Sequence, residues 1–197
     1  MPEPLRRGPY AKGVVRRQEI LREALAAYAE SGSTGPSLRS IAARVGLSER
    51  GLLHYFPARD ELFVAILAER DALDRATFDP DGLAAVAAHS AETPGLVRLF
   101  LEMAAAAPDA EHAAHGFFSR RYRQLREIVA RKFRGSAVET PVVHAPSVDP
   151  DYAARILIAA SDGLQIQWLL DPSIDLAGDL NRLSGLLRAA GRRSTQT

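Results

Sequence analysis

The 197-residue sequence contains no cysteine, which excludes disulfide bonds, thiolate zinc sites, iron–sulfur clusters and thiol nucleophiles from this chain. It also lacks any uninterrupted apolar run that approaches the roughly 20 residues of a membrane-spanning helix. Arg6 and Arg7 lie near the start, but the apolar core of a secretory signal does not follow them. From these absences we expect a soluble, cytoplasmic protein that has no membrane partner.

The chain as a whole also lacks a large excess of positive or negative charge, since its formal net charge is +1. The charges are nevertheless unevenly distributed, because residues 1–60 contain ten Lys and Arg against six Asp and Glu. Half of these basic residues form an N-terminal arm: Arg6, Arg7, Lys12, Arg16 and Arg17. A basic arm suits a polyphosphate partner, and it is equally compatible with a solubilising tail.

Helical periodicity, in contrast, is present along nearly the whole sequence. Hydrophobic residues make up 47% of the chain, which is enough to bury a core. Apolar positions recur every three or four residues, with Pro and Gly at the breaks, whereas a β-like pattern is limited to residues 141–143. The pattern predicts an all-α fold. The expected helices cover residues 14–30, 38–45, 49–55, 59–77, 83–89, 95–106, 111–133, 150–170 and 176–190.

Two of the predicted helices are short and lie close together. Ser37 can cap the first, and Gly46 can end it because glycine readily adopts the positive φ that often follows a helix. Only Leu47 then separates Gly46 from Ser48, which can cap the helix over residues 49–55. So tight a turn makes the helices cross steeply, which is helix-turn-helix geometry. The second helix of such a unit presents its N-terminal half to base edges in the major groove of DNA.

The outer face of this second helix contains an unusual glycine. We expect Leu53 and Phe56 to face the core, and Gly51 to lie on the opposite, exposed side with three polar neighbours: Glu49, Arg50 and His54. Glycine inside a helix costs about 1 kcal/mol relative to alanine. Close approach of another surface explains Gly51 better than helix stability does. Two alternatives stay open for the neighbouring rings: Tyr55 and Phe56 can be core aromatics, and His54 can be a surface histidine without a base contact.

These segments together resemble the DNA-binding domain of TetR-family regulators. The resemblance follows the family's order and spacing over about the first third of the chain, in residues 17–25, 37–42, 45–48, 53–56 and 59–62. It implies a dimeric, all-helical repressor that binds a palindromic operator in double-stranded DNA and releases it when a small-molecule effector binds. No cofactor is expected.

The same resemblance implies how the chain is divided. A basic flexible arm is expected over residues 1–13, a three-helix DNA-binding domain over residues 14–58, and a ligand-binding and dimerisation domain over residues 59–197. The helix at 59–77 connects the two domains and has one side formed by Leu62, Ile66, Glu69 and Leu73. In TetR-like proteins this connecting helix transmits the ligand signal.

By resemblance, Tyr55 and Arg59 contact phosphates, with Arg59 at a position where the family often has lysine. Ser37 and Arg39 are expected to hold the DNA backbone as well, and the base-facing surface is assigned to Arg50, Gly51 and His54. The residues expected to contact DNA are Ser37, Arg39, Ser48, Glu49, Arg50, Gly51, His54, Tyr55 and Arg59.

Two apolar stripes in the C-terminal part indicate core. One contains Leu96, Phe100, Met103 and Ala107, and the other contains Phe118, Tyr122, Leu125, Val129 and Phe133. A cavity between them is implied by the family resemblance. Inside a largely apolar helix, Asp162 and Gln165 need a partner across a dimer, an arginine, or a ligand. The residues expected to line an effector pocket are Phe100, Met103, Phe117, Phe118, Tyr122, Asp162, Gln165 and Trp168.

The helix at 150–170 is apolar on two faces, and the helix at 176–190 can cover only part of it. A second subunit that forms a four-helix interface is the economical solution, and an internal helix in a monomer is the alternative. A dimer also places two recognition helices about 34 Å apart, as successive major grooves require. The expected interface residues are Tyr152, Ile156, Ala159, Gly163, Ile166, Leu170, Leu183 and Leu187.

Two other classes of function were weighed against this interpretation. His112 and His115 lie one helical turn apart beside Glu111, a spacing that can hold a metal in an all-α enzyme, but a third ligand is not identifiable. A glycine-rich phosphate loop, a nucleophile elbow and a recognisable acid/base pair are missing, so an enzyme is not expected. A DNA-binding protein without an effector is the remaining alternative.

Overall fold

The computed structural model describes residues 9–77, 83–135 and 148–190. Within these ranges the chain forms nine α-helices and one short 3-10 helix and contains no strand, which confirms the all-α prediction. The helices are α1 (Pro9–Glu30), α2 (Leu38–Arg44), α3 (Glu49–Tyr55), α4 (Arg59–Thr77), α5 (Leu83–Ser90), α6 (Pro94–Ala106), α7 (Ala114–Gly135), α8 (Pro150–Leu170) and α9 (Leu176–Ala190), with the 3-10 helix η1 at Gly32–Thr34.

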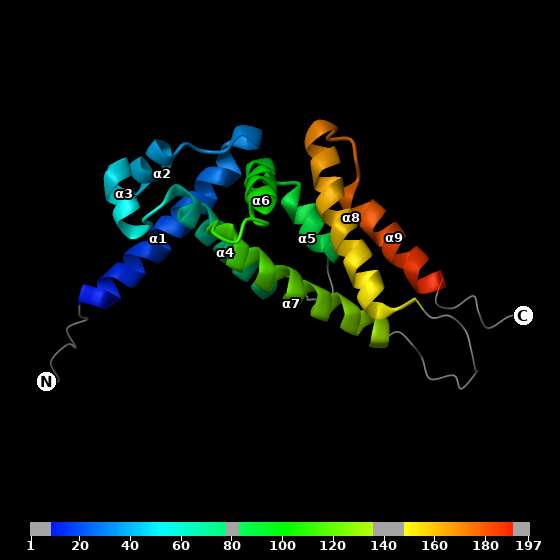
Figure 1. The fold of residues 1–197 in the computed structure, drawn as a ribbon. Coiled ribbons are helices and arrows are strands. Elements are labelled where there is room, and N and C mark those ends of the chain that lie inside the picture. The colour runs from blue at the N-terminus through cyan, green and yellow to red at the C-terminus, as the bar shows by residue number, and fades with distance from the viewer. Residues whose placement is uncertain (1–8, 78–82, 136–147, 191–197) are drawn as a thin grey trace, which may run out of the picture.

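The helices form an elongated arrangement with α1–α3 at one end and α8 and α9 at the other (Figure 1). Between the two ends, α4 and α6 lie in the middle, and α7 runs from the middle toward α8 and α9. In the described part of the chain, no helix is both long enough and apolar enough to cross a membrane.

The largest hydrophobic core continues from α1–α3 through α4 and α6 into α7. Its fully buried side chains include Ile20, Ile41, Leu52, Phe56, Leu62, Ile66, Phe100 and Phe118. A second cluster joins α5, α6, α8 and α9 through Ala87, Val97, Trp168, Leu176 and Leu180. A third cluster joins α7 and α8 through Val129, Ala130, Ala154 and Leu157. Because the first core is continuous, α4 packs against α1 on one side and against α6 and α7 on the other.

The predicted helix boundaries are correct within a few residues, with two exceptions. Helix α1 begins at Pro9, inside the segment expected to be a flexible arm. Helix α7 begins at Ala114 because the preceding residues form turns, in which Asp109 Oδ1 accepts a hydrogen bond from the Glu111 backbone and His112 Nδ1 accepts one from the Ala114 backbone. The β-like residues 141–143 lie outside the described part of the chain.

Two helices bury other side chains than their apolar stripes indicate, and the prediction that Leu53 of α3 faces the core was wrong. In α3 it is Leu52, one turn before Phe56, that is fully buried, whereas Leu53 is only half-buried. In α4 the apolar side ends at Leu67, because Leu73 is exposed and the charged residues Arg70 and Asp74 are buried instead. The second difference has a functional consequence, since it places charge inside the molecule.

Candidate nucleic-acid interface and internal cavity

Helices α2 and α3 form the tight two-helix unit that the serine and glycine spacing predicted. The Ser40 backbone N–H donates to Ser37 Oγ at 3.1 Å and caps α2. The Gly51 backbone N–H donates to Ser48 Oγ, also at 3.1 Å, and caps α3. Between the helices Gly46 has a φ of 65°, a left-handed conformation that favours glycine. These contacts confirm the local basis of the predicted turn.

The outward side of α3 is polar and accessible. Glu49, Arg50 and His54 are exposed, and Gly51 is half-buried between them. A Cβ atom added to Gly51 would meet its nearest neighbours, Ser48 Oγ and Leu47 Cβ, at 3.4 and 3.6 Å, which is ordinary van der Waals contact. The packing of the protein itself therefore does not require glycine at this position.

Two arginines of the predicted N-terminal arm hold α1 against the two-helix unit. The Arg17 side chain donates to the Tyr55 backbone oxygen at 2.6 Å and lies 4.0 Å from the centre of the Phe56 ring. The Arg16 side chain donates to the backbone oxygen of Val45 at the end of α2. These two cations therefore belong to the folded helix, as the helix predicted over residues 14–30 requires, and they contact the backbone at the ends of α2 and α3.

The remaining predicted DNA contacts lie around the same end of the molecule. Ser37 and Arg39 are exposed at the start of α2, and Tyr55 is half-buried with its ring edge-on to His54. Arg59, the first residue of α4, is exposed and lies over the Phe63 ring, 3.9 Å from a Glu102 carboxylate oxygen. All nine predicted residues lie on α2, α3 or their immediate flanks (Figure 1). That they contact DNA stays a prediction.

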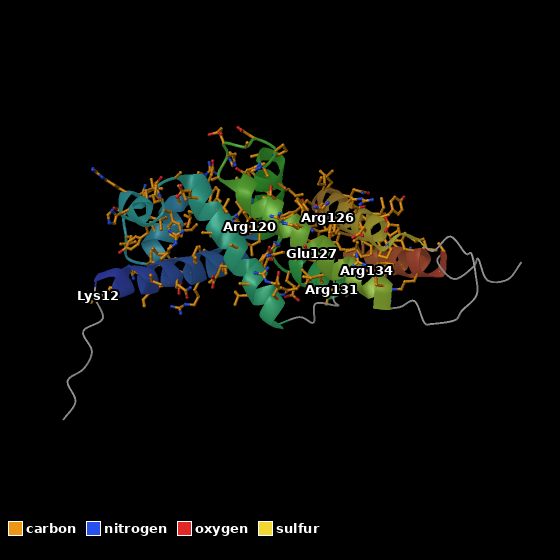
Figure 2. All side chains as sticks on the ribbon, turned by 60° about the horizontal axis from the view of Figure 1, so that its bottom comes forward. Lys12, Arg120, Arg126, Glu127, Arg131 and Arg134 are labelled. Carbon is orange, nitrogen blue, oxygen red and sulfur yellow. The ribbon has the colours of Figure 1, made fainter. Side chains whose placement is uncertain are left out.

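Positive charge is not confined to the N-terminal part of the folded chain. Figure 2 shows a row of exposed basic side chains along the outer face of α7, which consists of Arg120, Arg126, Arg131 and Arg134. Arg134 pairs with Asp151 of α8 at 3.2 Å, and Glu127 lies within the row. This row is separate from the α2–α3 unit and was not singled out from the sequence.

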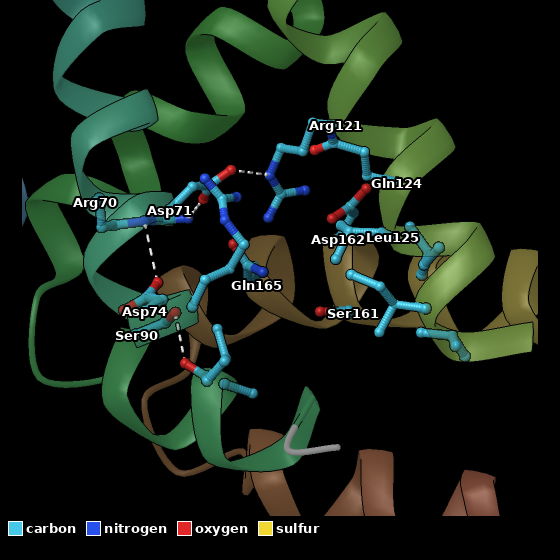
Figure 3. Close-up of a pocket in the computed structure, with 16 residues that line it drawn as sticks. Arg70, Asp71, Asp74, Ser90, Arg121, Gln124, Leu125, Ser161, Asp162 and Gln165 are labelled. Carbon is cyan, nitrogen blue, oxygen red and sulfur yellow. Dashed lines mark hydrogen bonds and ion pairs between the residues drawn. The ribbon is translucent and has the colours of Figure 1, made fainter. Parts of the chain in front are cut away.

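A cavity of about 280 Å³ lies between α4, α5, α7 and α8 (Figure 3). Its apolar lining consists of Val86, Ala87, Leu125, Ile128, Val129 and Ile158. Its polar lining consists of Arg70, Asp71, Asp74, Arg75, Ser90, Arg121, Gln124, Ser161, Asp162 and Gln165. The cavity therefore combines an apolar wall with an unusually high number of charged groups.

A network of ion pairs crosses this cavity from α4 to α7. Arg121 Nε of α7 donates to Asp71 Oδ2 of α4 at 2.9 Å. Arg70 is almost fully buried and lies 3.5 Å from Asp71 and 3.8 Å from Asp74. Burial lowers the pKa of Arg70 and raises the pKa of Asp74, because both charged forms lose their hydration. The ion pairs offset part of this cost.

Asp162 finds its polar partner in a tyrosine. The Tyr122 hydroxyl donates to Asp162 Oδ2 at 2.7 Å, which connects α7 to α8 beside the cavity. Burial raises the pKa of Asp162 more than the Tyr122 hydrogen bond and the nearby Arg121 charge lower it. Among the alternatives considered from the sequence, Asp162 therefore lines the cavity and is bonded within its own chain.

The structure divides the predicted pocket residues between the cavity and the core. Asp162 and Gln165 line the cavity, and Tyr122 contacts it only through Asp162. The others belong to packed clusters and do not line it, which corrects the prediction: Phe100, Met103 and Phe118 are in the first core, Phe117 packs against that core, and Trp168 is in the second cluster. Sequence analysis missed Arg70, Asp71, Asp74 and Arg121. The signal was available in α4, where charged residues replace the apolar side after Leu67.

The predicted dimer surface on α8 is open in the single chain. Tyr152, Ile166 and Leu170 are 49%, 51% and 83% exposed, although all three are large and apolar. Ala159 is exposed as well, and Ile156 and Gly163 are half-buried. Leu183 and Leu187 of α9 are half-buried and pack against the α7–α8 cluster of the same chain, and a dimer interface formed by these eight residues stays a prediction.

The two histidines considered for a metal site have separate partners. His112 Nε2 lies 3.2 Å from Asp60 Oδ2, and His115 Nδ1 lies 2.9 Å from the Ala107 backbone oxygen. Among the residues that the structure describes, no group of three or more His, Asp or Glu side chains is arranged to hold a metal ion.

Two protein-family models match the chain. The model described as bacterial regulatory proteins, tetR family, matches residues 20–66. The model described as BetI-type transcriptional repressor, C-terminal, matches residues 81–183, which is just over half of the chain. The first match covers the two-helix unit, and the second covers the cavity helices α5, α7 and α8 but not α4.

Curated relatives are similar over part of their length. RutR, an HTH-type transcriptional regulator of Escherichia coli strain K12, is 34% identical over 110 residues, which is 47% of this chain and 50% of RutR. AcnR, an HTH-type transcriptional repressor of Corynebacterium efficiens, is 34% identical over 83 residues, which is 42% of this chain and 44% of AcnR. The chain thus spans about half the length of the curated relatives it matches.

Solved structures match most of the chain at low sequence identity. A transcriptional regulator from Rhodococcus sp. Rha1 has a TM-score of 0.60 at 20% identity, with 87% of this chain and 95% of that chain covered. NalD, the secondary repressor of the MexAB-OprM multidrug efflux pump in Pseudomonas aeruginosa, has a TM-score of 0.54 at 19% identity, with 91% and 96% covered. At these identities the likeness establishes the shared fold.

Proposed function

The chain belongs to the TetR family of bacterial regulatory proteins, and we propose that it is a transcriptional repressor that binds a palindromic operator as a dimer. A small molecule in the cavity between α4, α5, α7 and α8 releases it from the DNA. The observation that carries this proposal is the serine-capped α2–α3 unit with an exposed polar face on α3. Such a repressor acts in the cytoplasm, where the operator lies.

The surface around α3 has the chemistry that a DNA groove requires. Arg50 and His54 lie on the exposed side of α3, where side chains of a recognition helix reach base edges. Arg39 and Arg59 lie on the flanking helices, where their guanidinium groups can pair with phosphates. Arg17 holds the backbone of Tyr55, so α3 is presented from a fixed position on α1.

The open face of α8 supports the dimer. Exposed apolar side chains at Tyr152, Ile166 and Leu170 lose contact with water when a second copy packs against them. A two-fold arrangement then presents two α3 helices to successive major grooves on one side of the duplex. A boundary between the DNA-binding domain, which ends at residue 58, and the second domain, which begins at residue 59, fits this arrangement. Helix α4 begins at Arg59, shortly after the two-helix unit.

The position of α4 supports release by a ligand. Its first residue, Arg59, follows α3 after the short connection 56–58, and its buried second half forms one wall of the cavity. A ligand that favours a different position of α4 relative to α7 shifts the dimer toward a state whose α3 helices no longer match the operator. The shift is limited by the difference in the ligand's affinity for the two states.

The proposal is tested by selecting bound sites from a pool of genomic DNA fragments and measuring affinity for the recovered sites by mobility shift. The expected result is a palindromic site bound by two copies, with a much lower affinity for random DNA at the same salt concentration. A protein that remains monomeric at working concentrations and binds none of the duplexes in low salt would contradict it. Site-specific binding that no compound in a broad ligand panel relieves would instead favour a DNA-binding protein without an effector.

A further inference from the structure

Several polar atoms of the cavity residues make no hydrogen bond within the described part of the chain. Arg121 uses its Nε for Asp71, and its two terminal nitrogens make no hydrogen bond within the described chain. In Figure 3 the end of this guanidinium group points into the cavity, between Asp71 and Asp162. A guanidinium group held on one side, with its terminal fork open, is arranged to bind a planar anion.

The guanidinium group of Arg70 lies against the same carboxylate, Asp71, and it also has nitrogen atoms without a hydrogen-bond partner. The Arg70 side chain is only 10% exposed, and its Nε and Nη1 atoms have no hydrogen-bond partner within the described residues. Gln165 is 9% exposed, and its Oε1 atom is likewise without a partner. Buried polar groups without hydrogen-bond partners are costly and rare, and their concentration beside one cavity favours a ligand that carries charge or hydrogen-bonding groups.

The acidic groups at the cavity are already engaged. Asp71 and Asp74 lie against Arg70 and Arg121, and Asp162 accepts the hydrogen bond from Tyr122. Burial also raises the pKa of Asp162, which weakens its negative charge beside an incoming anion. A cationic ligand, in contrast, would be brought next to the guanidinium groups of Arg70 and Arg121, with which Asp71 and Asp74 already form ion pairs.

We infer that the cavity binds a small organic carboxylate whose carboxyl group lies on the terminal nitrogens of Arg121 and whose body is apolar. The apolar body packs on Leu125 and Ile128, which follow Arg121 along α7 by one and two turns, and on Ile158 of α8. The volume of about 280 Å³ lies at the lower end of the range for ligand pockets, so a single ring or a short branched chain fits it. Binding of the carboxylate is independent of DNA, and its role as the effector rests on the proposed function.

The inference is tested with two matched sets of probes that share a body and differ in charge. The first set is benzoate, benzamide and benzylamine, and the second is 4-methylpentanoate with its amide and its amine. Each is titrated into the full-length protein at pH 7 without DNA, by calorimetry and by thermal melting. The expected result is binding and a raised melting temperature for at least one carboxylate, with no effect of its amide or amine at the same concentration. Equal binding of the neutral or cationic compounds, or no binding of either acid, would overturn the inference.

Variants of α7 locate the bound carboxylate. Arg121→Gln removes the charged fork and is expected to weaken carboxylate binding about ten- to hundredfold, as the loss of charged hydrogen bonds predicts. Arg120→Gln is the matched control, because Arg120 is an exposed neighbour on the outer face of the same helix, and it should leave the affinity unchanged. Unchanged affinity in Arg121→Gln would show that the anion lies elsewhere.

A second variant is needed because Arg121→Gln also removes a partner of Asp71 and can unfold the chain. Ile128→Trp fills the apolar side of the cavity while the Arg121–Asp71 pair remains. It should abolish carboxylate binding in a protein that still melts cooperatively, and retained binding would contradict the site.

Mobility shift then separates the carboxylate inference from the proposed release of DNA by a ligand. A carboxylate that binds without releasing operator DNA contradicts the proposed release only, and a non-carboxylate that binds in the cavity and releases DNA contradicts this inference only.

Discussion

Arg121 Nε donates a hydrogen bond to Asp71 Oδ2 at 2.9 Å, and this contact joins α7 to α4 inside the body of the protein. The two side chains are 15% and 9% exposed, so the pair is screened little by solvent. Asp71 also lies 3.5 Å from Arg70 on its own helix. One carboxylate therefore serves two buried cations, and it does so on the helix that leads to α3.

Removal of this shared carboxylate should destabilise the protein strongly. In Asp71→Asn the Arg121 and Arg70 side chains stay buried but lose their common anion, and breaking a buried pair in this way costs about 3 kcal/mol or more. The free energy of unfolding, measured by urea denaturation, should fall by this amount. The control is Asp179→Asn, which breaks the exposed pair with Arg182 and should change stability by less than about 1 kcal/mol. Equal effects of the two variants would mean that the buried network is not held by charge.

Arg59 and Arg50 are expected to contribute differently to DNA binding. Arg59 lies at the start of α4, so Arg59→Ala should weaken binding similarly on all sequences and lower the salt-dependence slope by about 1. Arg50 lies on the exposed side of α3, so Arg50→Ala should lower the preference for the selected site by about 1–3 kcal/mol. Mobility shifts on specific and random duplexes over a salt series measure both effects. Identical losses for the two variants would remove this division of roles, and Arg120→Ala on α7 serves as the charge-matched control.

The local signals in the sequence are sufficient to predict the two-helix unit formed by α2 and α3. Ser37, Gly46 and Ser48 act on backbone groups within a few residues, so their spacing alone predicts the caps and the turn that the structure contains. The early start of α1 could also have been found, because Pro9 is a residue that often begins a helix. Features determined by neighbouring residues were therefore predictable.

The cavity was not predictable in the same way. Burial of Arg70 and Asp71 results from α6 and α7 packing against α4, and these helices are distant from Arg70 in the sequence. A stripe pattern assigns charged residues to the surface, so it does not indicate that Arg70 and Asp74 are buried while Leu73 is exposed. The aromatic residues of α7 were assigned to a pocket because they are large and apolar, but Phe118 fills the first core instead. Tertiary packing decided both outcomes.

The exposed apolar face of α8 predicts a dimer that a single charge can disrupt. Leu170 is 83% exposed in the single chain, so Leu170→Glu should leave the fold intact and prevent a second copy from packing there. Light scattering coupled to gel filtration should show a monomer, and affinity for a palindromic site should fall while affinity for random DNA changes little. Leu73→Glu is the control, because Leu73 is also an exposed leucine but lies on α4. A dimer that persists in Leu170→Glu would place the interface elsewhere.

Gly51 permits a test in which stability and DNA binding change in opposite directions. A Cβ at this position meets only ordinary contacts with Ser48 and Leu47, and alanine favours a helix over glycine by about 1 kcal/mol. Gly51→Ala should therefore raise the free energy of unfolding by up to this amount. If the backbone of α3 approaches DNA closely at Gly51, the same methyl group should weaken operator binding by tenfold or more.

The matched control for this variant is Gly185→Ala. Gly185 lies within α9, and a Cβ added there meets nothing within 4 Å, so alanine should again stabilise the protein. Because α9 is at the opposite end of the molecule from α3, operator affinity should stay unchanged (Figure 1). Urea denaturation and mobility shift measure the two quantities on the same samples. If Gly51→Ala is more stable and binds the operator with unaltered affinity, close contact between DNA and the α3 backbone does not explain the glycine at this position. The side of α3 that faces the DNA groove would then have to be reassigned.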